Sequence, residues 1–136
     1  MRTILGFYQD HLLAAGRPKG QSGGLGRDVS LRAAVDAAAS KLETVFAGEP
    51  LVELSIRDAL GKTYYHLGEP AQAIPQWERA LQLAKQALSP DHPDTLVVMN
   101  HLGDAYRTVG KLSKATELHE EALRRLRACA RSRENR

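Results

Sequence analysis

The sequence predicts an all-α protein, an α-solenoid of two helical hairpins preceded by one or two N-terminal helices. The first observation is a repeat: the motif Leu-Gly-x-x-Tyr at residues 60–64 returns 42 residues later at 102–106. A fixed period of about 20 to 50 residues is typical of supersecondary units stacked in an array. The second observation is that no segment alternates β-branched and polar residues, so we expect no strands.

Further residues match at the same offset and extend the repeat over both helices of each hairpin. The matching positions are glycines 68 and 110, alanines 73 and 115, and the Glu-x-Ala-Leu segments 78–81 and 120–123. Stacked units of this kind form extended concave surfaces. Such arrays bind other chains more often than they catalyse reactions.

The composition fits thin, closely packed helices in one domain or a piece of one. Of the 136 residues, 43% are hydrophobic but only 5% are aromatic, and the abundant alanine has the highest helix propensity. No run of about 18 apolar residues and no basic-then-apolar N-terminus is present. We therefore expect no membrane span, no signal peptide and a cytoplasmic location.

The net charge of +3 is unevenly distributed. Residues 124–136 hold six Arg and one Glu, a balance of +5, so the other 123 residues sum to −2. A block of like charge is typically a solvated end, and we expect no nucleic-acid partner. Cys129 is the only cysteine, so it forms no internal disulfide, and it lacks the neighbours of a zinc site.

The segment 1–27 is predicted to hold a helix and a linker. Residues 1–15 place apolar side chains at helical spacing and predict a short amphipathic helix. Residues 16–27 contain five glycines and one proline. Because glycine loses conformational entropy when it is ordered, this stretch is expected to be a linker or an irregular loop.

The segment 28–50 is predicted to be one packing or capping helix. Its apolar positions predict a helix over 30–46, with Asp28 or Ser30 as the N-cap. We expect this helix to cap the N-terminal end of the first hairpin.

The first repeat is predicted over 51–93. One helix is expected over 51–67, where apolar residues share a face. Gly68-Glu69-Pro70 is the expected turn, because glycine ends helices and proline starts them. The second helix is expected over 70–88, before a proline-containing break.

The second repeat is predicted over 94–136 and carries an Arg-rich C-terminal extension. Its helices are expected over 94–109 and 112–130, separated by Gly110-Lys111. Asp94 or Thr95 is the expected N-cap of the first of these helices.

Stacked hairpins need small residues where helices cross and large residues that fill the gaps between them. Gly61, Ala73 and Ala80 are spaced for close approach, and Tyr64 and Trp77 are the expected fillers. A ligand-stacking role for Trp77 is the less favoured alternative.

These residues resemble the tetratricopeptide repeat, whose pattern has Leu-Gly-x-x-Tyr in its first helix and Ala, an aromatic residue and Ala in its second. The matching residues are Leu60, Gly61, Tyr64, Gly68, Ala73, Trp77 and Ala80, then Leu102, Gly103, Tyr106, Gly110, Ala115 and Ala122. His119 stands where the second aromatic residue is expected. The resemblance implies a protein-interaction module.

The 42-residue period and the segment MNHLGDAY at 99–106 resemble the kinesin-light-chain type of this repeat. A wider resemblance covers RPKGQ and GGLGRDVSLR, followed by FAGEPLVELSIRDALGKTYYHLGEPAQAIP. These segments look like the region after the kinase domain in large bacterial serine/threonine kinases. No kinase motif is present, so no kinase activity is expected of this chain.

Two repeats are fewer than the about three that arrays usually need to bury a continuous core. The outer side of the last helix is therefore expected to be open. Either the chain is part of a longer array, or it dimerises through this open end.

The resemblance implies a concave groove lined by the first helix of each repeat. The implied residues are Ser55, Asp58, Ala59, Lys62, Tyr65 and His66, then Val97, Asn100, His101, Asp104, Arg107 and Thr108. This mixed set suits an extended peptide held by hydrogen bonds, with Asn100 the best candidate because an amide both donates and accepts. Asp58 and Asp104 would oppose an anion. The alternative is that these residues are solvated faces of a spacer or oligomerisation segment.

Other chemistries find little support, and we expect no enzyme, cofactor or metal. Gly61-Lys62-Thr63 ends like a phosphate-binding loop, but Ile56 stands where that loop needs a glycine. The five histidines include no pair three or four residues apart and no completing cysteine or carboxylate cluster.

Overall fold

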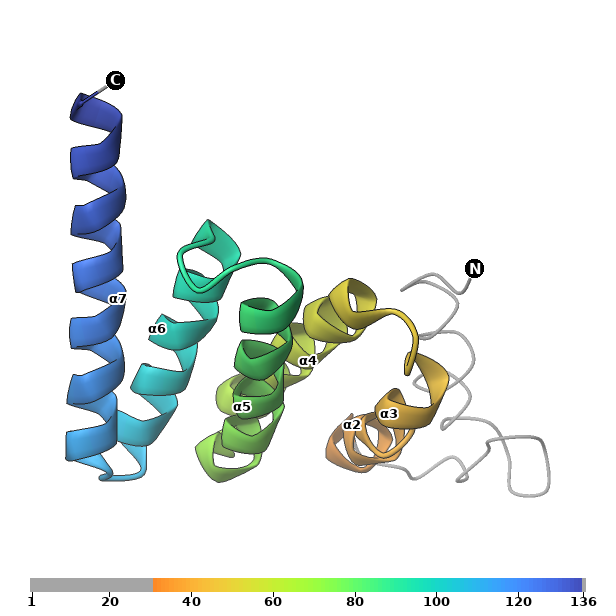
Figure 1. The fold of residues 1–136 in the computed structure, drawn as a ribbon. Coiled ribbons are helices and arrows are strands. Elements are labelled where there is room, and N and C mark those ends of the chain that lie inside the picture. The colour runs from red at the N-terminus through yellow and green to blue at the C-terminus, as the bar shows by residue number, and fades with distance from the viewer. Residues whose placement is uncertain (1–30, 136) are drawn as a thin grey trace, which may run out of the picture. The chain divides into compact units, whose positions relative to one another are not determined.

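The computed structural model of the protein describes residues 31–135 (Figure 1). The chain divides into two compact units, Met1–Ile56 and Arg57–Arg136, and helix α4 contributes to both. The predicted helix over 1–15, the linker over 16–27 and the caps Asp28 and Ser30 lie outside the described residues. The packing of the capping helix on the first hairpin also stays a prediction, as do the four segment boundaries.

In the first unit, the single helix predicted over 30–46 is wrong. The structure has α2 (Leu31–Ala39) and α3 (Leu42–Val45), which are separated at Ser40 and Lys41. The Ser40 hydroxyl donates to the Ala37 carbonyl at 2.8 Å, and the Lys41 N–H donates three residues back, to Ala38, at 3.1 Å. Serine competes with helical hydrogen bonding in this way, so the helix tightens and stops.

Apolar residues on both sides of this break form the core of the first unit. The buried members are Ala34, Val35, Ala38, Leu42, Phe46, Leu54 and Ile56. The apolar periodicity was therefore a correct guide to burial, although it did not reveal the break.

The second unit contains the rest of α4 (Pro50–His66), α5 (Pro70–Ala87), α6 (Pro93–Thr108) and α7 (Leu112–Glu134). The helix predicted over 112–130 continues to Glu134, because no glycine or proline follows and arginine and alanine favour helix. The other three helices match their predicted bounds within one residue. Residues 31–135 contain no strand, and the predicted all-α fold of two repeated hairpins is confirmed.

Helices α4 and α6 end in the same way. Gly68 has a φ of +79°, the Glu69 N–H donates to the Tyr64 carbonyl at 2.9 Å, and the Gly68 N–H donates to the Tyr65 carbonyl at 3.1 Å. This is the Schellman arrangement, which needs a left-handed residue. At the corresponding turn the φ of Gly110 is +85°, and the bonds run from Lys111 to Tyr106 at 2.8 Å and from Gly110 to Arg107 at 3.0 Å.

The predicted N-cap of α6 is wrong. The Nδ1 atom of His92 accepts from the Asp94 N–H at 3.1 Å and makes His92 the cap, while the Thr95 hydroxyl donates to the Ser89 carbonyl at 2.7 Å. Pro93 explains the shift: its fixed φ suits the first helical position, so the cap must be the residue before it.

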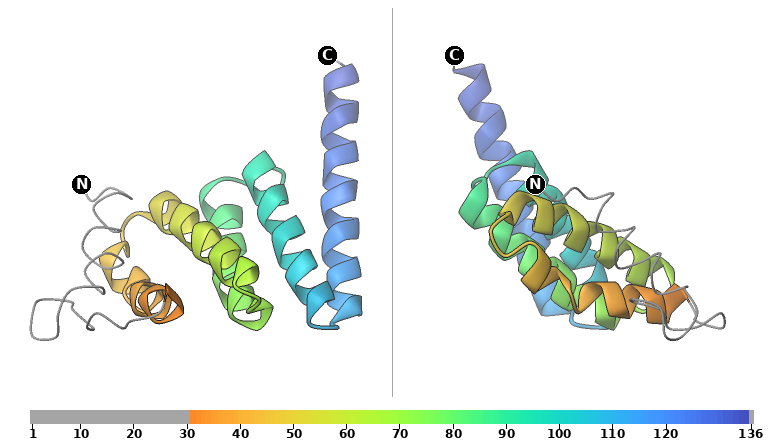
Figure 2. Two further views of the ribbon diagram at one scale, coloured as in Figure 1. Left: turned by 180° about the vertical axis from the view of Figure 1, so that it is seen from behind. Right: turned by 90° about the vertical axis from the view of Figure 1, so that its right-hand side faces the viewer.

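Helices α5, α6 and α7 lie side by side in the second unit (Figures 1 and 2). Helices α6 and α7 are close where their turn joins them and diverge towards the start of α6 and the end of α7. A Cβ atom added to Gly61 would lie 2.5 Å from the Trp77 ring, and one added to Gly103 would lie 2.6 Å from the His119 ring. The glycines therefore lie at the helix crossings, as predicted.

Candidate functional site

The Asp58 carboxylate is the centre of a hydrogen-bond network that joins α4, α5 and α6. Its Oδ1 accepts from Trp77 Nε1 at 2.9 Å and lies 3.0 Å from His101 Nδ1. Its Oδ2 lies 2.9 Å from Lys62 Nζ. The side chain of Asp58 is only 18% exposed, so these three partners replace most of its water.

The network keeps Asp58 ionised. Burial raises the pKa of this carboxyl, but the hydrogen bonds with His101, Lys62 and Trp77 and the positive charge of Lys62 lower the pKa further, to about 2. The carboxylate is therefore ionised at neutral pH, where it anchors the three side chains around it.

Trp77 is a packing residue, as predicted, and also a hydrogen-bond donor. It is 2% exposed, and its ring lies over the bare backbone of Gly61. The ring centroids of Tyr65 and His101 are 6.0 and 5.3 Å from that of Trp77. Aromatic neighbours at these separations add to the energy of burial.

A pocket of about 240 Å³ opens above this network. Its lining residues are Lys62, Tyr65, His66, Trp77, His101 and Asp104. The structure thus brings five of the residues predicted for the groove together around one hollow, with the buried Trp77 as part of its floor.

Two more predicted residues border this pocket along α6. The hydroxyls of Tyr65 and Thr108 lie 3.1 Å apart, and Thr108 also donates to the Asp104 carbonyl at 2.8 Å. Arg107 donates to the Asp104 carboxylate at 3.3 Å. A line of polar groups therefore extends from α4 onto α6.

The remaining predicted residues lie elsewhere. Val97 and Asn100 line a different cavity of about 450 Å³, together with Leu126 and Cys129 of α7. Asn100 Oδ1 is 3.4 Å from His119 Nδ1. Ser55 belongs to the first unit, where its hydroxyl donates to the Leu51 carbonyl at 3.1 Å.

The sequence interpretation missed the bond between Asp58 and Trp77. A signal was present: Asp58 precedes Trp77 by 19 residues, and Asn100 precedes His119 by the same 19 residues. Within a repeated hairpin, an acceptor on the first helix and a ring N–H on the second at a constant spacing predict such a pair.

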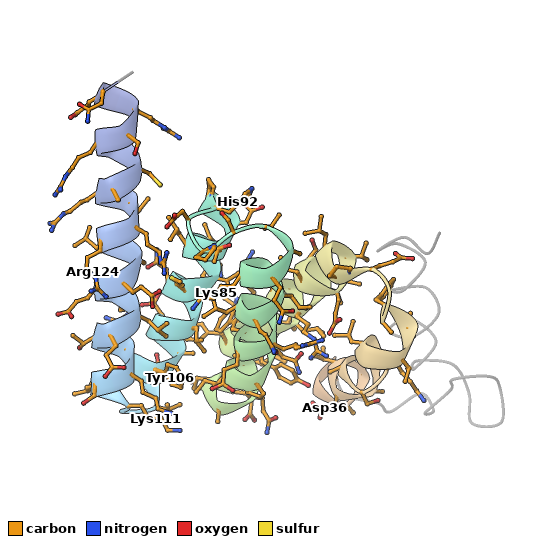
Figure 3. The ribbon with its side chains drawn as sticks, viewed as in Figure 1. Asp36, Lys85, His92, Tyr106, Lys111 and Arg124 are labelled. Atoms are coloured by element: carbon orange, nitrogen blue, oxygen red, sulfur yellow. The ribbon has the colours of Figure 1, made fainter. Side chains whose placement is uncertain are left out.

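A second polar contact joins α5 to α6. The Tyr106 hydroxyl donates to Glu78 Oε1, and burial and this carboxylate raise the pKa of Tyr106 to about 12. Figure 3 shows Tyr106 and Lys111 near the turn between α6 and α7. The Nζ atoms of Lys111 and Lys114 lie 5.9 and 5.3 Å from the centre of the tyrosine ring, within the reach of a cation–π contact.

A third contact fixes the start of α6 to α7. The Arg125 guanidinium donates to Asp91 at 2.9 Å and to Glu121 at 2.8 Å, and these bonds raise the pKa of Arg125. Arg124 beside it lies on α7, and His92 lies near the start of α6 (Figure 3).

Neither a metal cluster nor a membrane helix is found in the described part of the chain. Among residues 31–135, no group of three or more His, Cys, Asp or Glu side chains is placed to hold a metal ion. None of the helices in that range is long and apolar enough to cross a bilayer.

The two similar hairpins, with their matching glycine turns, define a helical-repeat protein. The sequence profile of the tetratricopeptide repeat matches residues 53–128, more than half of the chain. The protein therefore belongs to the tetratricopeptide repeat family, whose fold is typically a non-catalytic module for protein–protein interaction or scaffolding. The predicted association with a kinase stays a prediction, as does the absence of enzymatic activity.

Nephrocystin-3 of Xenopus laevis is a partial relative. It is 47% identical to this chain over 65 residues, which are 48% of this chain and 5% of that protein. No solved structure matches the chain.

Proposed function

We propose that this chain is a protein-interaction module that binds an extended peptide, or a segment of another helical array, in the groove between α4 and α6. The groove is defined by the residues of the pocket and its border: Lys62, Tyr65, His66, Trp77, His101, Asp104, Arg107 and Thr108. The observation that carries the proposal is the convergence of these side chains from two repeats on one hollow with a buried aromatic floor.

The chemistry of the groove suits a peptide backbone. Lys62 and Arg107 offer N–H donors and are about half or more exposed, at 50% and 65%. Asp104 offers acceptors, and the hydroxyls of Tyr65 and Thr108 both donate and accept. An extended peptide presents alternating N–H and C=O groups that such a mixed set can satisfy.

The network beneath the pocket reduces the cost of binding. Asp58 holds Trp77, His101 and Lys62 in fixed positions before any ligand arrives. A preorganised floor loses less side-chain entropy on association. The sequence suggested that both Asp58 and Asp104 would oppose an anionic ligand. Because Asp58 is enclosed by its partners, Asp104 is the carboxylate that an anionic ligand would meet.

A double variant tests the groove. Peptides selected from a random display library on the wild-type chain would be measured by fluorescence anisotropy against Lys62→Ala/Arg107→Ala. We expect the dissociation constant to rise about tenfold or more, since two charged hydrogen bonds are lost. The matched control is Arg124→Ala/Arg131→Ala, which removes the same charge from exposed positions of α7 and should bind as the wild type does. Equal affinities for all three proteins would contradict the proposal.

A second candidate function is oligomerisation, as in a spacer segment of a multidomain protein such as a bacterial serine/threonine kinase. The observation that favours it is the exposure of Leu123 and Leu126 on α7, at 46% and 48%. Large apolar side chains gathered on one helix face indicate a surface that another chain covers.

A further inference from the structure

The 42-residue repeat allows one face of α5 to be compared with its counterpart on α7. On α5 this face consists of Ile74, Trp77, Leu81 and Ala84, all of them buried. Helix α6 packs against α5, and the ring centroid of its His101 lies 5.3 Å from that of Trp77 on this face. The face is thus a docking surface for a helix within the second unit.

The corresponding face of α7 is only partly covered in the described part of the chain: the His119 ring lies over Gly103 of α6, whereas Leu123 and Leu126 are about half exposed. The residues of this face are Thr116, His119, Leu123, Leu126 and Ala130, which we call the outer face of α7. The side chain of His119 is 39% exposed. The side of α7 towards α6 buries Ala115 and Ala122 and adjoins the outer face, whose Leu126 and Ala130 line the cavity shared with α6.

The outer face has the spacing of a coiled-coil seam. Its five residues follow one another at alternating steps of three and four, so they form a continuous stripe along the helix. The two leucines occupy the middle of the stripe. Glu120 and Arg127, both exposed, lie on one flank of the stripe and are seven residues apart.

We infer that the outer face of α7 is covered by the outer face of α7 from a second copy of this chain, in an antiparallel arrangement with two-fold symmetry. The inference rests on the second candidate function above and specifies its surface and register. An isologous interface of this kind must be self-complementary. The leucines of the outer face and the opposite charges of Glu120 and Arg127 on its flank meet that condition.

The register follows from the positions of the leucines. If Leu123 of one copy opposes Leu126 of the second copy, symmetry makes the reverse contact as well. In that register Glu120 comes within about two residues of the level of Arg127 on the second copy, again twice. Opposite charges on the flanks of a seam set the orientation of coiled helices.

The cavity between α6 and α7 adjoins this interface. It is the larger hollow of about 450 Å³, and Leu126 and Ala130 form part of its wall. These are the positions that oppose Leu123 and His119 of the second copy. The hollow therefore offers room for side chains that the second copy brings.

Sedimentation velocity over a dilution series of the full chain tests the inference. The wild type should be a dimer that dissociates on dilution, and Leu126→Glu should raise its dissociation constant at least about a hundredfold, because two carboxylates would face an apolar seam. The control is Leu67→Glu, which changes a leucine of similar exposure, 40%, outside α7 and should leave the dimer intact. Circular dichroism of both variants would verify that they are folded.

A charge exchange tests the register. Glu120→Arg alone should weaken the dimer about tenfold, and Glu120→Arg/Arg127→Glu should restore it to within about threefold of the wild type, because each pair re-forms in reverse. A dimer that Leu126→Glu breaks but the exchange does not rescue would overturn the antiparallel register and leave oligomerisation through α7 standing. A wild type that stays monomeric at high concentration, or a dimer indifferent to Leu126→Glu, would overturn both.

Discussion

The two hairpins, α4–α5 and α6–α7, have the same backbone arrangement but differ in how far their packing residues are buried. In the first, Trp77 fills the space over Gly61, donates to Asp58 and is buried beneath α6. In the second, His119 takes the place of Trp77 over Gly103, and its side chain is 39% exposed. The same backbone geometry thus encloses a rigid aromatic anchor in one repeat and leaves a smaller, half-exposed ring in the other.

The acceptor on the first helix changes together with the ring. Asp58 is paired with three donors, whereas its counterpart Asn100 reaches His119 at 3.4 Å. A charged acceptor is suited to a desolvated site with several donors, and a neutral amide is sufficient at an exposed one. The difference is that the first hairpin holds a mostly buried acceptor and a buried ring, whereas the corresponding pair in the second hairpin is more exposed.

The largest expected difference between the hairpins concerns these two rings. Trp77→Ala should lower the free energy of unfolding by about 3–5 kcal/mol, because it empties a buried site and leaves Asp58 with fewer donors. His119→Ala should cost less than about 1 kcal/mol, since its ring is half exposed. Urea unfolding followed by circular dichroism would measure both, and comparable losses would contradict the asymmetry.

Replacing the crossing glycines Gly61 and Gly103 by alanine should change the stability of the two hairpins by different amounts. Gly61→Ala places Cβ against the enclosed indole of Trp77 and should destabilise the fold by about 1–3 kcal/mol. At Gly103→Ala the His119 ring can turn towards solvent, and the gain in helix propensity of about 1 kcal/mol offsets the remaining strain. Thermal melts should therefore separate the two variants. Equal melting temperatures would argue against this picture.

The contributions of the two acceptors, Asp58 and Asn100, to stability should differ in their dependence on pH. The pKa of Asp58 is lowered from 3.8 to about 2 in the folded chain. Its stabilising effect is therefore complete above pH 4 and is lost as the pH falls through the folded pKa. The stability difference between the wild type and Asp58→Asn should shrink by roughly 1–2 kcal/mol between pH 5 and pH 2.

The control for this titration is Asn100→Ala, because Asn100 carries no ionisable group. Its stability difference from the wild type should be the same at both pH values. An Asp58→Asn profile that stays parallel to the wild type would show that Asp58 is not held ionised by its partners.

The turn glycines should show no contrast. Gly68 and Gly110 have φ values of +79° and +85°, and no atom would touch a Cβ at either position. An alanine at either site must adopt the left-handed conformation, at a cost of about 1–2 kcal/mol. Equal losses in Gly68→Ala and Gly110→Ala would confirm that the two hairpins turn alike, whereas unequal losses would show that one turn carries an additional constraint.

Local signals in the sequence were sufficient for most of the fold. The glycine stops at 68 and 110 and the crossing glycines depend on backbone geometry, which the residue type reveals directly. The break at Ser40 and Lys41 and the cap at His92 were missed. The break arises from a competing side-chain bond, and the cap from the effect of Pro93 on its neighbour.

The candidate site was only partly predictable. Repeat positions placed Lys62, Tyr65 and His101 on the same surface, and these three side chains line one pocket in the structure. The repeat positions did not indicate that Val97 and Asn100 line a separate cavity with α7, because that cavity depends on the divergence of α6 and α7. Nor did they reveal the three donors around Asp58, which come from three different helices.

Thiol accessibility tests most directly whether the face of α5 is buried while the matching face of α7 is exposed. In a Cys129→Ser background, Leu81→Cys and Leu123→Cys place one thiol at equivalent positions, 8% and 46% exposed in the leucines. At a dilution that keeps the chain monomeric, the thiol at 123 should react with a disulfide reagent at least about a hundredfold faster than the thiol at 81, because reaction at the buried site requires local unfolding. Equal rates at the two positions would contradict the account.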